Sequence, residues 1–111
     1  VMAGKFELYK DTAGKYRFRL KASNGQIIAS GEAYESRASA LSGIESVRKN
    51  AADDANFERK TASDGSPYFV LNSAANGQTV GKSEMYQSAA AMENGIASVT
   101  TNAGDASIKE A

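Results

Sequence analysis

The strongest constraint on this chain is an internal repeat of about fifty residues. Phe6-Glu7 recurs as Phe57-Glu58, and one residue inserted near Ala75 then shifts the register of the match. The other recurring positions are Gly14 and Gly65, Phe18 and Phe69, Leu20 and Leu71, Asn24-Gly25-Gln26 and Asn76-Gly77-Gln78, Glu32 and Glu84, Tyr34 and Tyr86, Ser36 and Ser88, Gly43-Ile44 and Gly95-Ile96, and Asn50-Ala51 and Asn102-Ala103. Residues 1–111 are therefore predicted to be a single domain of two repeats, about 5–52 and 56–104, followed by a short C-terminal segment, 105–111.

Composition narrows the classes of protein that this chain can be. The 13 basic residues balance 13 acidic ones, so no net charge opposes folding, and a modest core supplemented by alanine is expected. Cysteine and histidine are both absent, which removes disulfides, thiolate nucleophiles, most zinc sites and the usual general base near neutral pH. We therefore expect no cofactor, no metal site, no catalytic residue and no enzymatic activity. No apolar stretch suits a leader or a membrane span, so a cytoplasmic protein without a membrane partner is expected.

Each repeat is predicted to contain three strands and a helix. Tyr16, Phe18 and Leu20 alternate with Arg17, Arg19 and Lys21, as in an antiparallel sheet with one buried face. Asn24-Gly25 and Asn76-Gly77 predict tight hairpins with type I′ turns, because both central residues of such a turn need positive φ. Ser107-Ile108-Lys109 could form a short terminal strand.

The helix of each repeat is predicted to begin after a serine N-cap, Ser36 or Ser88. An apolar stripe follows on each helix, at Ala40, Ile44 and Val47 and at Met92, Ile96 and Val99. Gly43 and Gly95 fall inside these helices, where glycine costs about 1 kcal/mol relative to alanine. We infer that each glycine marks a close approach of helix and sheet that a Cβ would obstruct.

With these features, the chain resembles the YegP-like family of small bacterial proteins of unknown function. The residues that carry the likeness are Leu20-Lys21-Ala22-Ser23-Asn24-Gly25-Gln26 and Gly43-Ile44-Glu45-Ser46-Val47-Arg48. The resemblance implies an α+β fold of tandem β(3)-α-β units that share one antiparallel sheet, with two helices packed on one face. It also implies that the strand after each helix is exchanged between units. It implies no functional residue.

A candidate binding surface lies on the outer face of the predicted sheet. The basic row Arg17, Arg19 and Lys21 could meet phosphates, or it could be a solvated face. The equivalent positions in the second repeat are Tyr68, Val70 and Asn72, which are uncharged. Tyr68 and Val70 would be exposed unless a partner or the terminal segment of the chain covers them.

Two further polar patterns have both a functional and a structural interpretation. Glu32-x-Tyr34-x-Ser36 and Glu84-x-Tyr86-x-Ser88 could line a polar site, or could serve as strand end, core edge and helix cap. The amides of Gln26 and Gln78 could recognise a ligand, whereas turn formation already explains Asn24-Gly25 and Asn76-Gly77. The sequence therefore favours a non-catalytic binding or protein-interaction module of unknown partner. A nucleic-acid-binding protein is the alternative, and an enzyme comes third.

Overall fold

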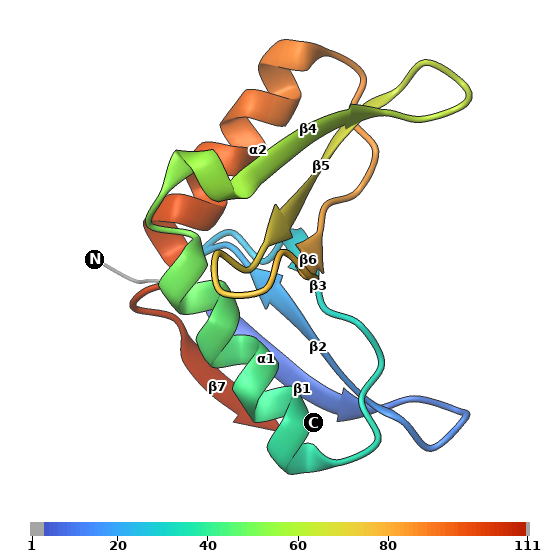
Figure 1. The fold of residues 1–111 in the computed structure, drawn as a ribbon, viewed down its shortest axis with the longest axis vertical. Helices are drawn as coiled ribbons and strands as arrows, with labels where there is room; N and C mark the ends of the chain where they lie inside the picture. Colours follow the sequence, from blue (N-terminus) through green and yellow to red (C-terminus); the bar gives the residue numbers. More distant parts are fainter. Residues whose placement is uncertain (1–3, 111) are drawn as a thin grey trace.

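The computed structural model describes residues 4–110 and contains one seven-stranded sheet covered by two α-helices (Figure 1). The strands are β1 (Lys5–Lys10), β2 (Tyr16–Lys21), β3 (Ile27–Ser30), β4 (Phe57–Thr61), β5 (Pro67–Asn72), β6 (Thr79–Lys82) and β7 (Ser107–Glu110). The helices are α1 (Arg37–Asn50) and α2 (Ala89–Asn102), and a short 3-10 turn, η1 (Asp54–Asn56), precedes β4. Neither α-helix of this described part is long and apolar enough to cross a membrane.

The two repeats form equivalent halves of the sheet, whose strand order is β4-β5-β6-β3-β2-β1-β7. Strand register is the same in both halves, since Phe6 pairs with Leu20 in the first and Phe57 with Leu71 in the second. The halves meet between β3 and β6 through the single pair Ser30 and Lys82. The fold is thus the predicted α+β duplication. One detail differs, because β7 runs parallel to β1 and the sheet is therefore mostly, but not wholly, antiparallel.

Exchange between the repeats ties the halves together. The strand after α1 is β4, which pairs with β5 of the second repeat, whereas the strand after α2 is β7, which pairs with β1 of the first. Each helix also spans the joint, α1 packing on β2 and β6 and α2 on β5 and β3. Two asparagines repeat this pattern at the helix ends. The side-chain oxygen of Asn50 accepts from Ala74 N at 2.9 Å, and that of Asn102 accepts from Gly4 N at 3.0 Å.

A serine begins each α-helix. The Ser36 hydroxyl accepts a hydrogen bond from Ser39 N, and the Ser88 hydroxyl accepts one from Ala91 N, both at 3.1 Å. Each bond satisfies one of the backbone donors that a helix leaves unpaired in its first turn.

The hairpin turns differ from the sequence prediction. No residue other than glycine has positive φ in the described chain, so Asn24 and Asn76 do not form type I′ turns. Ala22 N donates to Gln26 O and Gly25 N donates to Ala22 O, which closes a three-residue loop with Gly25 at φ 86°. A three-residue loop is the pattern of a tight turn followed by a glycine bulge, and it replaces the predicted two-residue loop. Asn24 instead accepts a hydrogen bond from Gln26 N at 3.0 Å.

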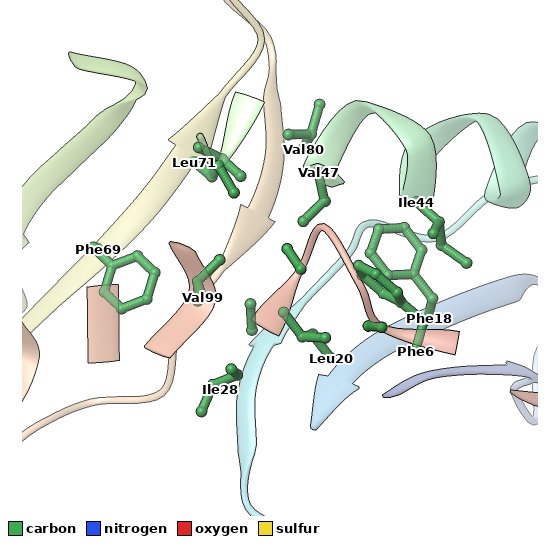
Figure 2. Packing of buried hydrophobic residues seen from close by; sticks show 14 of the residues in the cluster. Phe6, Phe18, Leu20, Ile28, Ile44, Val47, Phe69, Leu71, Val80 and Val99 are labelled. Atoms are coloured by element: carbon green, nitrogen blue, oxygen red, sulfur yellow. The ribbon is translucent and has the colours of Figure 1, made fainter. Parts of the chain in front are cut away.

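The core lies between the sheet and the helices. Its largest fully buried side chains are Phe6, Phe18, Phe69, Leu20, Ile44, Leu71, Val47 and Val99. Figure 2 shows Ile44 of α1 near the rings of Phe6 and Phe18, and Val47 near Val80 of β6. The alternating strand pattern and the helical stripe therefore meet in one cluster that includes both repeats.

Candidate functional site

Acidic side chains neutralise the basic row Arg17, Arg19 and Lys21 on the outer face of the sheet. Glu7 of β1 lies between two members of the row, 2.7 Å from Arg19 Nε and 3.1 Å from Lys21 Nζ. The hydrogen bond from Arg19, which outweighs partial burial and is reinforced by Lys21, holds the pKa of the Glu7 carboxyl below its ordinary value. Arg17 lies 3.7 Å from the Asp11 carboxylate. Each residue of the row thus has an acidic partner.

The second-repeat half of the same face is covered by its own side chains. Val70 is only 6% exposed although strand alternation places it opposite the helices, since its neighbours Phe69 and Leu71 belong to the core. Its cross-strand partners are Glu58 and Lys82, whose long side chains flank it. Val70 was expected to be exposed unless a partner or the terminal segment covered it; in the structure it is covered, and the residues beside it belong to the adjacent strands β4 and β6. The terminal segment lies at the far edge of the sheet.

Tyr68 is half-buried and lies beneath a cation. Lys82 Nζ is 5.3 Å from the centroid of the Tyr68 ring, within the range of a cation–π contact. Tyr68 and Val70 belong to β5, whereas Arg17, Arg19 and Lys21 belong to β2, with β6 and β3 between them. Neighbouring strands are about 4.8 Å apart, so three strand spacings, about 14 Å, separate β5 from β2. The five residues of the predicted surface therefore do not form one cluster.

The two other polar patterns do come together, in a groove between the repeats. We call it the hairpin–helix groove; it has a volume of about 630 Å³ and is lined by Lys21, Ala22 and residues 24–28 of the β2–β3 hairpin, by Glu84 and Tyr86, and by Ala91, Asn94, Gly95 and Ser98 of α2. The first repeat supplies the hairpin and the second supplies the helix. Gln26 came from one predicted pattern and Glu84 and Tyr86 from the other, and all three residues line this groove.

The glycine in each helix creates room for a tyrosine. A Cβ on Gly95 would lie 2.7 Å from Cζ of Tyr86, and one on Gly43 would lie 2.7 Å from Cζ of Tyr34. Both tyrosine rings stack on core phenylalanines, with centroid distances of 6.2 Å from Tyr86 to Phe69 and 6.1 Å from Tyr34 to Phe18. Burial, and then the neighbouring carboxylates Glu84 and Glu32, raise the pKa of Tyr86 and of Tyr34.

The equivalent place in the other half of the molecule holds a smaller cavity with a different lining. The related cavity between α1 and the β5–β6 turn has a volume of about 490 Å³ and is lined by neither Glu32 nor Tyr34. The inserted residue lengthens that turn, because Gly77 N donates to Ser73 O, one position further back than the corresponding bond from Gly25 to Ala22. The inserted residue near Ala75 is visible in the sequence, but the two polar patterns carry the same side chains, so the sequence did not show that the insertion changes the cavity beside them.

Two arginines that the polar patterns did not select, Arg37 and Arg48 of α1, contact β7 and the residue before it. The guanidinium of Arg48 donates to the Ala106 carbonyl and lies 5.5 Å from the centroid of the Phe6 ring. Arg37 forms an ion pair with Glu110 of β7. The signal available in the sequence was that both arginines lie on α1, while the equivalent positions on α2 are Ala89 and Thr100.

The fold and this groove define a class, small α+β proteins of two tandem repeats that share one sheet. Comparison with known proteins then places the chain in a family. The family model described as a domain of unknown function, DUF1508, matches residues 11–58 and again 62–110, so the chain belongs to that family in two copies.

Full-length relatives agree with this assignment. A UPF0339 protein of Bordetella pertussis is 53% identical over 109 residues, covering 98% of this chain and 96% of the relative. The UPF0339 protein YegP of Escherichia coli O157:H7 is 49% identical over 109 residues, covering 98% of each. The predicted resemblance to YegP-like proteins is confirmed.

Solved structures confirm the fold. The solution NMR structure of yegP from E. coli, described as a protein of unknown function, matches with a TM-score of 0.93 at 47% identity, covering 99% of this chain and 94% of that one. A UPF0339 protein of Shewanella oneidensis, also solved by NMR, matches with a TM-score of 0.91 at 41% identity, covering 98% and 92%. These descriptions indicate no specific function.

Proposed function

We propose that this protein is a non-catalytic binding module of the bacterial cytoplasm and that the hairpin–helix groove is its binding site. One observation carries the proposal. The groove gathers Gln26 from one repeat and Glu84, Tyr86 and Asn94 from the other around an apolar floor. A concave site with a few convergent polar groups at a junction between structural units is the usual form of a ligand site.

Absence of histidine and cysteine from the sequence supports a binding role over a catalytic one. Ser98 lines the groove, and its hydroxyl accepts a hydrogen bond from Asn102 Nδ2 at 3.2 Å. Among the groove residues, Lys21 is the one candidate for a base that could activate this hydroxyl. Lys21 is engaged by Glu7. A nucleophilic role would need such a base.

The contacts weigh against the alternative, nucleic-acid binding through the basic strand face. Phosphate binding draws its affinity from cations that release their counterions when a phosphate binds. Here Arg17 is already paired with Asp11, and Arg19 and Lys21 are paired with Glu7. A steep fall of affinity with added salt, lost in an Arg17→Ala, Arg19→Ala double variant, would favour the alternative.

The experiment that tests the proposal is an amide NMR screen of small polar and amphipathic compounds against the full chain. Binding in the groove predicts shifts concentrated at Gln26, Ile27, Asn94 and Gly95. The cavity beside α1 is the internal control, with Ser42 and Ala75 as reporters. Shifts centred on the outer-face residues Arg19 and Tyr68 instead, or no localised shift with any compound, would contradict the proposal.

A further inference from the structure

The hairpin–helix groove carries an uncompensated negative charge. Glu84 is exposed and forms no ion pair with any residue of the described chain, residues 4–110. Lys21 is the other charged residue of the groove, and its ammonium lies 3.1 Å from Glu7 on the outer sheet face. Because Glu7 already compensates Lys21, Glu84 is the charged residue of the groove that has no ion-pair partner among residues 4–110, and the neighbouring cavity that it also borders contains Arg17 and Lys82.

The groups around Glu84 accept hydrogen bonds. Tyr86 lies two residues beyond Glu84 in the chain, and its phenol oxygen lies against Gly95 of the same groove. Gln26 and Asn94 also line the groove, and each amide carries an acceptor oxygen beside its N–H donors. An ammonium group has three donors and no acceptor, so a carboxylate, a phenol oxygen and an amide oxygen together satisfy it. An anionic ligand could accept hydrogen bonds from the phenol and the amides, but it would be repelled by Glu84 and would find no unpaired cation among the groove residues.

The floor of the same groove is apolar. Ile27 is 37% exposed, one of few large apolar side chains so exposed within residues 4–110, and Ala22 and Ala91 lie beside it. A short methylene chain can lie on this floor while its charged end reaches the polar wall, in the manner of a lysine stem. The groove therefore combines an apolar floor with a single anionic end.

We propose that the hairpin–helix groove binds an alkylammonium group, with the charge at Glu84 and the methylene chain on Ile27. This inference rests on the proposed function and gives it a ligand class. Two sources supply the same chemistry, a free aliphatic amine and the lysine side chain of a polypeptide.

The duplication supplies a matched control within the chain. Glu32 is the counterpart of Glu84, and it too forms no ion pair in the described chain. Both carboxylates border the cavity at the joint of β3 and β6, but only Glu84 also lines the hairpin–helix groove. Replacing Glu32 therefore changes the net charge of the protein equally while leaving the groove intact.

The test is an NMR titration of the full chain with n-butylammonium and with n-butanol, its neutral counterpart, at one pH and one ionic strength. We expect n-butylammonium to bind with a dissociation constant about tenfold lower, as for a hydrogen-bonded charge against a neutral group. Glu84→Gln should remove that preference, and Glu32→Gln should keep it. Equal dissociation constants for the two probes, or a preference that survives Glu84→Gln, would overturn the inference.

Two further arms separate the remaining questions. Nα-acetyl-lysine methylamide that binds about tenfold more tightly than n-butylammonium assigns the group to a polypeptide, whereas equal or weaker binding assigns it to a free amine. If n-butanol occupies the groove as tightly as n-butylammonium, the groove remains the binding site and only the charge assignment is overturned. If neither probe nor any compound of the wider screen shifts the groove resonances, the inference and the proposed function both fail.

Discussion

Tyr86 covers Gly95 so closely that a Cβ on the glycine would lie 2.7 Å from Cζ of the ring, and closer still to its hydroxyl. A third group confines the site, since Phe69 Cε2 would be 3.2 Å from the same Cβ. The tyrosine also stacks on Phe69 and lines the groove, so the missing side chain positions both a core aromatic pair and a candidate ligand group.

Gly95→Ala is expected to destabilise the protein by about 1–3 kcal/mol, because the overpacked ring must move even though alanine favours the helix by about 1 kcal/mol. Denaturant unfolding measures the change. Gly104→Ala is the control, since nothing lies within 4 Å of a Cβ there. Tyr86→Phe removes the nearest atom, so the double variant should lose less than the sum of the single losses. A Gly95→Ala protein as stable as wild type contradicts the packing account.

The turn at Gly25 predicts a different kind of cost. Its φ is 86° and nothing lies within 4 Å of a Cβ built on it, so a substitution meets strain in the backbone and not a clash. Gly25→Ala should cost about 1–2 kcal/mol, the penalty of the left-handed region for a residue with a Cβ. Gly25→Asn should cost less despite its larger side chain, because asparagine tolerates that region. Unfolding curves in which asparagine is the worse of the two would count against a strain-based cost.

Glu7 gives a prediction with a pH dependence. Its pKa is lowered in the folded protein from an ordinary value of 4.5, so the stability that it contributes is present above that value and is lost as the pH falls through the lowered one. Glu7→Gln should therefore lower the free energy of unfolding at pH 7 by at most about 1 kcal/mol, with a difference that vanishes in acid. Glu32→Gln, which removes no ion pair, is the control. A difference that grows on acidification would reverse the assigned sign.

Val70 tests the covering of the outer face. Because it is 6% exposed, Val70→Ser should cost about 1–3 kcal/mol through lost packing and an added hydroxyl. Met85→Ser, at a side chain 50% exposed, should change stability by no more than about 0.5 kcal/mol. Thermal and denaturant melts of both variants measure these effects. Equal costs would mean that the neighbouring strands do not shield Val70 in solution.

Local sequence pattern was sufficient for most of the fold. Period-2 alternation at Phe18 and Leu20, the serine caps and the recurrence of the whole pattern depend on neighbours along the chain, and each predicts an element directly. The prediction of a type I′ turn at Asn24-Gly25 was wrong because the same dipeptide occurs in two-residue and three-residue loops. The choice between them is made by the closing pair Ala22 and Gln26, which sequence does not show.

The site was less predictable because its parts come from different repeats. Gln26 and Glu84 are far apart in sequence, and only the packing of α2 beside the β2–β3 hairpin brings them into one groove. The shielding of Val70 likewise depends on Glu58 and Lys82 across two strand pairings. Patterns along the chain report which face a side chain takes, but not what covers that face.

The equivalent strands β1 and β4 are protected from pairing with another chain by different means. Leu8 of β1 and Arg59 of β4 occupy equivalent positions, since Leu8 pairs with Phe18 and Arg59 with Phe69. Leu8 is 2% exposed, and the strand that carries it is covered by β7. On β4 the same position holds a charge, because Arg59 Nε lies 2.8 Å from Glu93, and its guanidinium also reaches Asp54 at 3.0 Å.

Arg59→Leu is therefore expected to turn β4 into an edge that resembles β1 without its cover. A charged side chain on the core-facing side of an edge strand discourages pairing with another chain, and leucine removes that obstacle while adding apolar surface. Sedimentation velocity should show association that rises with protein concentration in the Arg59→Leu variant more than in wild type. Arg59→Gln, which also breaks the ion pairs with Glu93 and Asp54 but stays polar, separates loss of charge from gain of apolar surface. If Arg59→Leu sediments as wild type does across the concentration range, Arg59 does not guard this edge, and the short length of β4 must be what keeps it unpaired.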